Sequence, residues 1–202
     1  MTGSTLNMHY TIADPKTFGI SEYEPVLPIY HSGQPEDSKE HCSDLLHRLD
    51  RIDPDRLSPE NAYTYRLLHR SLENDLALAD FPYYNEPLSP SSGMQSQLPV
   101  LLAEYTFRTK RDVTDYLALL DQIDDYFSSL LLYEQEKAAA GFFMPACSSE
   151  KVRKQCDTIV TTEELAQGTH FLQTTFEDRL SELQKQGLFT PKETASLIET
   201  ND

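Results

Sequence analysis

The sequence has no tryptophan, only seven glycines among 202 residues and only three cysteines. Cys42, Cys147 and Cys156 form no CxxC pair, so we expect small buried hydrophobic residues rather than a disulfide framework or a cysteine zinc site. No glycine-rich run is present, and neither G-x-x-x-x-G-K-[ST] nor G-x-G-x-x-G occurs. Nucleotide binding through a known phosphate loop is therefore not expected.

Basic residues are scarce as well. The chain has 17 Lys+Arg against 33 Asp+Glu, a formal net charge of −16, and both halves are acidic. A free nucleic-acid binder needs a basic patch to displace the counterions of phosphate, and a peripheral membrane binder needs one to meet anionic lipid. We therefore expect neither nucleic acid nor a membrane surface as a partner.

Long hydrophobic runs are also missing. The longest apolar stretches, such as Leu98–Ala103 and Ala138–Cys147, are far shorter than the roughly 18–20 residues that span a membrane. The first residues show no basic region followed by an apolar core, so no signal peptide is visible. We expect a soluble chain without a membrane span; its cellular location, and export of any longer parent, stay open.

Prolines and hydrophobic spacing divide the chain into two parts. Residues 1–35 contain four prolines and predict an extended, turn-rich N-terminal segment. Residues 36–202 predict a helical domain, because apolar residues recur at intervals of three and four. We expect a mainly α, multi-helical array of about five to six helices, over about 36–52, 59–79, 110–140, 149–168, 169–187 and from 190 onward.

One segment departs from this pattern. Residues 94–107 alternate polar and apolar side chains at first, and Pro99 would confine a strand to a sheet edge. The sequence therefore predicts a short extended or β segment around 94–107.

The last predicted helix begins at Thr190-Pro191-Lys192-Glu193, which combines a capping box with a proline start. Leu197 and Ile198 then lack a surface to pack on before Asp202. We expect that residues 36–202 are the truncated N-terminal half of a longer protein; a short frayed C-terminal helix is the alternative.

Metal-binding signals are weak. The sequence has no HExxH pair, in which two histidines one helical turn apart bind zinc. Glu40, Asp44 and His47 share one helix face, but a di-iron bundle needs such a motif twice. An exposed face on which Asp44 and His47 interact with Arg48 and Arg51 is the preferred interpretation. We predict no metal site in this chain, and a carboxylate metal protein using Asp44 and His47 is the minor alternative.

Catalytic signals are equally weak. No G-x-S-x-G nucleophile motif occurs. Asp121, Asp124 and Asp125 lie in the base-free run 112–136, where a solvated helix face is the simplest interpretation. We predict no catalytic residue in this chain.

The base-free segment Ser71–Phe107 carries five acids and five aromatic residues. Tyrosines and glutamines on an extended arm suit peptide contacts, because an edge strand can pair with a peptide backbone. Gln95, Gln97 and Tyr105 are therefore the candidate substrate-binding residues. The alternative is that the aromatic side chains only fill the space between helices.

Several segments, in order along the chain from Leu6 to about Ile198, resemble the bacterial domain-of-unknown-function 885 family. The resemblance rests on LNMHYTIADP from Leu6, LSPEN from Leu57, DFPYYNEPLSP from Asp80, QSQLPVLLAEY from Gln95 and YEQEKA from Tyr133. The segment from Gln95 to Tyr105 is the most specific of these.

The resemblance implies a longer, mostly helical protein of the gluzincin-like zinc metallopeptidase type, with HExxH in its C-terminal half. In such a parent, a zinc-bound water activated by the motif glutamate would hydrolyse a peptide or related amide. This chain lacks HExxH. It would therefore be the non-catalytic N-terminal helical portion, forming one wall of a substrate cleft. Zinc would belong to the parent, and the partners would be the missing C-terminal half and a peptide substrate.

A second hypothesis comes from a different class. The chain would be a free-standing helical module that binds a partner peptide or protein through the arm from Tyr83 to Phe107 and has no enzymatic role. The reading frame distinguishes the two, because an HExxH beyond Asp202 supports the first and a natural stop codon there supports the second.

Overall fold

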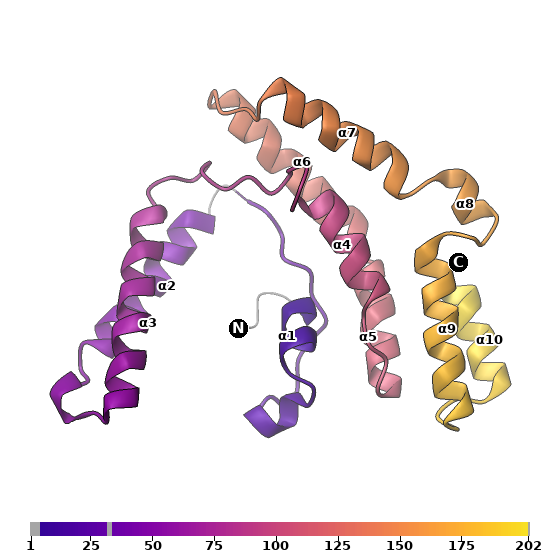
Figure 1. Cartoon of the computed structure of the whole chain (residues 1–202), viewed down its shortest axis with the longest axis horizontal. Coiled ribbons are helices and arrows are strands. Elements are labelled where there is room, and N and C mark those ends of the chain that lie inside the picture. The colour runs from indigo at the N-terminus through magenta and orange to yellow at the C-terminus, as the bar shows by residue number, and fades with distance from the viewer. Residues whose placement is uncertain (1–4, 32–33, 202) are drawn as a thin grey trace. The chain divides into compact units, whose positions relative to one another are not determined.

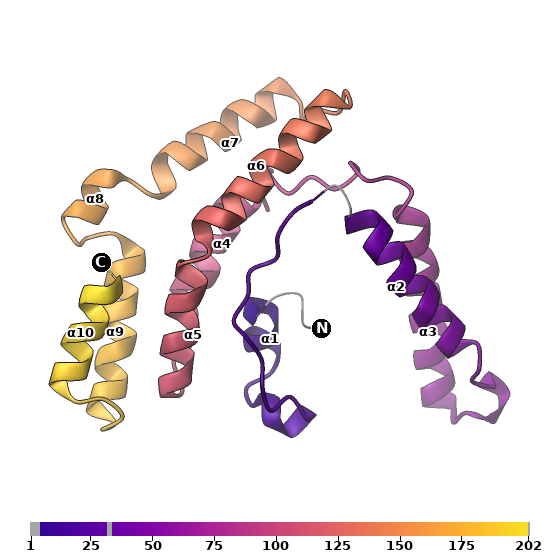
Figure 2. The same ribbon diagram turned by 180° about the vertical axis from the view of Figure 1, so that it is seen from behind.

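A computed structural model describes the backbone of residues 5–31 and 34–201 and the side chains of 5–31 and 38–201. Within this range every regular element is a helix, and no strand is present (Figures 1 and 2). The predicted mainly α class is confirmed. The α-helices are α1 (Thr5–Thr11), α2 (Gln34–Leu49), α3 (Pro59–Leu78), α4 (Met94–Ala103), α5 (Lys110–Leu120), α6 (Ile123–Ala139), α7 (Ala146–Ile159), α8 (Thr162–Ala166), α9 (Phe171–Lys185) and α10 (Pro191–Asn201), with 3₁₀ helices η1 (Pro15–Phe18) and η2 (Pro54–Arg56).

Helix starts follow the local chemistry of the sequence. Helix α3 begins at Pro59 after Ser58, whose hydroxyl accepts a hydrogen bond from the Asn61 backbone N–H. Helix α10 begins at Pro191, where the Glu193 carboxylate accepts from the Thr190 backbone N–H at 2.7 Å. Both starts agree with the sequence prediction because a cap acts within a single turn.

The predicted extended or β segment around 94–107 is wrong, because residues 94–103 form helix α4 with Pro99 inside it. Proline removes one backbone donor and disfavours a helix interior. Here Leu98, Pro99 and Leu102 are all buried. Burial of this apolar face outweighs the local preference that the sequence pattern expressed.

The prediction of five to six helices is too low. The helix expected over 110–140 is interrupted at Asp121 and Gln122, between α5 and α6. The Gln122 side-chain amide donates to the Pro25 carbonyl at 2.9 Å, and its oxygen accepts from the Leu27 backbone N–H at 3.0 Å. These contacts with a distant segment favour the break, so local periodicity could not predict it.

The structure has two further helices that the sequence did not predict. The helix expected over 149–168 is divided at Val160, whose backbone is extended, into α7 and α8. Helix α1 lies in the N-terminal segment that the prolines led us to expect as extended, and Leu6 and Met8 of this helix are buried.

The chain divides into two compact units. Unit 1 comprises the described parts of Met1–Ile29, Pro87–Ser129 and Met144–Asp202, and unit 2 comprises those of Tyr30–Glu86 and Leu130–Phe143. Helix α6 contributes its first half to unit 1 and its second half to unit 2.

Unit 1 is built on an aromatic core. Tyr105, Phe107 and Tyr116 pack with Phe176 of α9, with ring centroids 5.4–5.8 Å apart between neighbours. The Arg179 guanidinium lies over the Phe107 ring at 4.4 Å and donates to the Tyr105 carbonyl. Aromatic stacking and one half-buried cation thus join α9 to the segment that follows α4.

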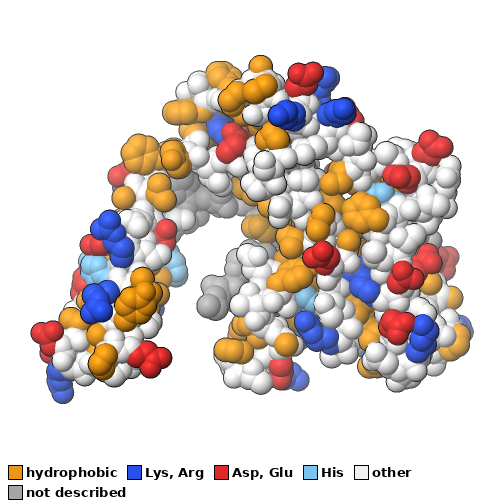
Figure 3. Space-filling model, in the orientation of Figure 1, with side chains coloured by type: hydrophobic (Ala, Val, Ile, Leu, Met, Phe, Trp, Pro, Cys, Tyr) orange, Lys and Arg blue, Asp and Glu red, His pale blue; other side chains and the backbone are white. Residues whose placement is uncertain are grey.

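Unit 2 is built on the antiparallel pair α2 and α3, which lie side by side in both views (Figures 1 and 2). Several large apolar side chains of α3, including Tyr63, Leu67 and Leu78, remain exposed. Figure 3 shows hydrophobic side chains at intervals along this pair, between charged ones.

None of the helices in the described ranges is long and apolar enough to cross a membrane.

Candidate functional site

Parts of two stretches that carry the family resemblance, 80–86 and 133–137, meet in unit 2. The Tyr133 hydroxyl on α6 donates to the Pro82 carbonyl at 3.0 Å. The Lys137 ammonium, one turn later on α6, donates to the Asn85 carbonyl at 3.2 Å and to the Glu86 carboxylate at 2.6 Å. The spacing of Tyr133 and Lys137 therefore places two donors on the helix face that holds the 80–86 segment.

Lys137 is the base in this contact, and only 4% of its side chain is exposed. A buried ammonium is costly unless an opposite charge and hydrogen bonds replace its water. Glu86 and the Asn85 carbonyl supply both. The 80–86 segment is thus held on α6 by an ion pair as well as by the Tyr133 hydrogen bond.

A second carboxyl group adjoins this ion pair. Burial raises the pKa of Glu134, the negative charge of Glu86 raises it further, and the positive charge of Lys137 opposes both. The two carboxyl groups are within hydrogen-bonding reach, and protonated Glu134 can donate to the Glu86 carboxylate. The group of three residues can therefore hold a proton as well as an ion pair.

An aromatic pocket of about 490 Å³ lies beside the ion pair. Its polar lining includes Glu86 and Lys137, and its aromatic lining consists of Phe81, Tyr83, Tyr84, Phe142 and Phe143. The Tyr83 ring lies near the rings of two other residues. Its centroid is 6.0 Å from that of Tyr133 and 5.9 Å from that of Phe142. Tyr84 and Phe143 are 79% and 73% exposed. Such a pocket can hold an apolar side chain, with charged groups at its edge.

The candidates predicted from the sequence, Gln95, Gln97 and Tyr105, lie in unit 1 and have different surroundings. Gln95 on α4 is 3% exposed and donates to the Ser89 carbonyl at 2.7 Å and to the Gln155 side chain at 2.9 Å. Tyr105 is fully buried, with its ring stacked on His9 at 3.7 Å. Gln97 is exposed on α4. Only Gln97 of the three therefore presents its side chain to solvent, and a binding role for these residues stays a prediction.

The stretches from Asp80 and from Tyr133 carry the family resemblance, but nothing in the sequence indicates that they meet. The available signal was the occurrence of four aromatic residues and one lysine in two family-like stretches. Contact between segments about 50 residues apart is decided by the fold and leaves no local pattern.

The candidate metal-binding residues do not assemble. Asp44 of α2 lies 3.8 Å from Arg48, with both side chains exposed, and His47 is exposed. The carboxylates Asp121, Asp124 and Asp125, which were weighed as catalytic candidates, are exposed as well. Across the part of the chain that the structure describes, no group of three or more His, Cys, Asp or Glu side chains could hold a metal ion. The residues described here therefore do not fit a zinc site.

Comparison with known proteins gives one match. A family model described as bacterial protein of unknown function (DUF885) matches residues 16–199, which include both stretches of the aromatic pocket. Neither a curated protein nor a solved structure matches the chain.

Proposed function

Because the chain belongs to the DUF885 family, we propose that it is the non-catalytic, N-terminal helical portion of a zinc-metallopeptidase-like protein. It forms one wall of a substrate cleft and holds the peptide, while the zinc site lies outside the chain. The observation that carries the binding role is the aromatic pocket beside Lys137 and Glu86.

The pocket has the chemistry of a peptide-binding surface. Exposed aromatic side chains contribute large apolar contact areas at a low cost in conformational entropy, because each has only two rotatable side-chain bonds. Tyr84, Phe142 and Phe143 have this exposure, whereas Tyr83 is anchored by its ring contacts. The ion pair of Lys137 with Glu86 fixes the backbone that carries these rings. An apolar peptide side chain is the ligand that this lining favours.

The predicted contacts Gln95, Gln97 and Tyr105 take different parts in this proposal. Gln97 is exposed and does not line the aromatic pocket, so it is a candidate contact with a longer substrate of the parent protein only. Gln95 and Tyr105 are positioning residues that hold α4 and the segment after it in place.

Binding of acetyl-Ala-Phe-Ala-amide to the 202-residue chain tests the peptide site. We expect NMR chemical-shift changes confined to residues near 80–86 and 137–143, and a Kd at least fivefold weaker for Tyr84→Ala and for Phe142→Ala. Tyr63→Ala is the matched control, because Tyr63 is an exposed aromatic residue of unit 2 outside the pocket. Shift changes elsewhere, or equal weakening by the control, would contradict the proposal.

The reading frame tests the peptidase part separately. An HExxH motif encoded beyond Asp202 is expected. A natural stop codon at that position would overturn the peptidase assignment and favour the free-standing interaction module, for which the exposed apolar residues Tyr63, Leu67 and Leu78 of α3 also speak.

A further inference from the structure

A second pocket of about 490 Å³ lies within unit 1, between η1 and the start of α5. Its lining includes three bases, Lys16, Arg108 and Arg111. The whole chain has only 17 bases against 33 acids. Bases gathered around one pocket of an acidic chain indicate a local preference for a negatively charged ligand.

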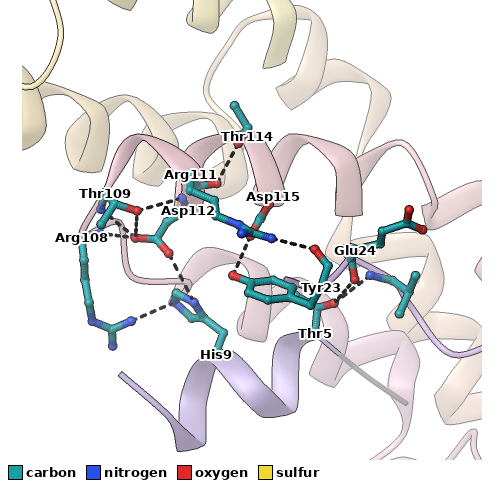
Figure 4. Close-up of polar contacts among 11 residues, drawn as sticks. Thr5, His9, Tyr23, Glu24, Arg108, Thr109, Arg111, Asp112, Thr114 and Asp115 are labelled. Atoms are coloured by element: carbon teal, nitrogen blue, oxygen red, sulfur yellow. Dashed lines mark hydrogen bonds and ion pairs between the residues drawn. The ribbon is translucent and has the colours of Figure 1, made fainter. Parts of the chain in front are cut away.

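The two acids of the pocket accept hydrogen bonds from backbone donors, and the Asp112 carboxylate also lies 3.8 Å from Nδ1 of His9. The Asp112 carboxylate accepts from the backbone N–H groups of Arg108 at 2.9 Å and Thr109 at 2.7 Å, which forms the capping box of α5 (Figure 4). The Asp14 carboxylate accepts from the Lys16 backbone N–H at 3.1 Å. Neither acid forms an ion pair with the side chain of Arg108 or Lys16 in the described residues.

Arg111 forms a fixed wall of the pocket. Its guanidinium lies 3.3 Å from the Asp115 carboxylate, donates to the Tyr23 carbonyl at 2.6 Å and stacks over the Tyr23 ring at 3.9 Å. The Tyr23 hydroxyl donates to the same Asp115 carboxylate at 2.8 Å, as Figure 4 shows. The charge of Arg111 is thus already balanced, and its geometry is set.

Arg108 is held in place without being neutralised. One of its terminal nitrogens lies 3.4 Å from Nε2 of His9, to which Figure 4 shows it pointing. Arginine can only donate, so Nε2 of His9 is the acceptor and the imidazole is neutral when this contact forms. His9 is itself fixed by stacking on Tyr105 at 3.7 Å. Arg108 therefore lines the pocket without an ion-pair partner among the described residues, and its contact with His9 restricts its orientation.

We propose that this pocket binds a carboxylate group of a peptide, with Arg108 as the principal partner and Lys16 as the second. A guanidinium matches a carboxylate with two parallel hydrogen bonds, and an ammonium adds a point charge. A volume of about 490 Å³ accommodates one or two amino-acid residues in addition to the carboxylate. The inference rests on residues of unit 1 alone and does not depend on the aromatic pocket.

Direct binding to the 202-residue chain, measured by titration calorimetry at low salt, tests the proposal. The probes are acetyl-Ala-Ala-Ala with a free C-terminal carboxylate, the same peptide as its amide, and acetyl-Ala-Asp-Ala-amide. We expect the free acid or the aspartyl peptide to bind at least tenfold more tightly than the amide. Tighter binding of the free acid identifies a chain terminus as the source of the carboxylate. Tighter binding of the aspartyl peptide identifies an acidic side chain.

Variants then locate the site. Arg108→Gln and Lys16→Gln are expected to weaken carboxylate binding about tenfold and about threefold. Arg108→Lys should restore part of the loss, because it returns the charge without the planar fork. Lys151→Gln on α7 is the control, because it removes the same charge from an exposed position outside the pocket.

Three outcomes would overturn the proposal: equal binding of acid and amide, tighter binding of inorganic phosphate than of any carboxylate peptide, and loss of binding in Lys151→Gln equal to that in Arg108→Gln. Arg108 and Lys16 are exposed, so their variants should unfold at the same temperature as the unsubstituted 202-residue chain. Matching unfolding temperatures would exclude misfolding as the cause of weaker binding. Acetyl-Ala-Phe-Ala-amide carries no carboxylate, so its failure to bind would count against the aromatic pocket only.

Discussion

His9 shows how one residue depends on its surroundings. It is buried, its ring stacks on Tyr105, and its Nδ1 lies 3.8 Å from the Asp112 carboxylate. Burial lowers the pKa of His9 below its usual 6.5; the nearby charge of Arg108 lowers it further, whereas Asp112 and, more weakly, Asp115 oppose the shift. The folded chain therefore holds His9 neutral under conditions in which the unfolded chain binds a proton.

This difference predicts a pH-dependent stability. The unfolded state binds more protons than the folded state near pH 6.5, so the His9 contribution is present above that pH and is lost as the pH falls through the lowered pKa. His9→Phe keeps the stacking and removes the titration. We expect the free energy of unfolding to fall less between pH 7 and pH 5 in His9→Phe than in the unsubstituted chain.

Urea denaturation at both pH values measures the effect. The difference between the two chains should not exceed about 2 kcal/mol, the full linkage of one histidine between pH 6.5 and 5. A steeper fall in stability for His9→Phe would show that Asp112 outweighs burial and that the shift has the opposite sign.

At the scale of elements, helix α5 illustrates what local sequence can specify. Thr109 and Asp112 form a reciprocal capping box, in which the Thr109 hydroxyl accepts from the Asp112 backbone N–H and Asp112 accepts from that of Thr109. The start of this helix was predictable because all the groups that form its capping hydrogen bonds lie within four residues of one another. Its end at Leu120 was not, because Gln122 is bonded to Pro25 and Leu27.

The cap predicts a measurable stability effect. Thr109→Ala should lower the free energy of unfolding by about 1 kcal/mol, because a backbone donor at the start of α5 loses its partner. Thr114→Ala on the same helix is the matched control, since the Thr114 hydroxyl donates only to the Arg111 carbonyl. Its effect should lie within about 0.5 kcal/mol of zero. Equal losses in urea denaturation would show that the capping box contributes nothing of its own.

For the whole molecule, the dominant property is a net charge of −16. Like charges repel one another in the compact state more than in the expanded unfolded chain, and salt screens that repulsion. The base-free stretches Ser71–Phe107 and Asp112–Glu136 concentrate the effect, because together they hold 12 of the 33 acids and no base.

Screening should therefore stabilise the chain. We expect the melting temperature to rise by about 2–4 °C between 20 mM and 0.5 M sodium chloride, which corresponds to roughly 1 kcal/mol for a chain of this size. Calorimetry at the two salt concentrations measures the shift. A lower melting temperature at high salt would mean that ion pairs such as Lys137 with Glu86 and Lys110 with Glu193 outweigh the net repulsion.

The sequence alone determined the helical class, the acidic character, the capped starts of α3, α5 and α10, and the family resemblance, because each of these depends on composition or on residues within a few positions of one another. Tertiary structure decided that residues 94–103 are helical, that Gln95 and Tyr105 are buried, and that 80–86 meets α6 at an aromatic pocket. The physical reason is the same in each case. The stabilising partners, buried apolar side chains and a single buried ammonium, come from segments far apart in the chain, and only packing brings them together.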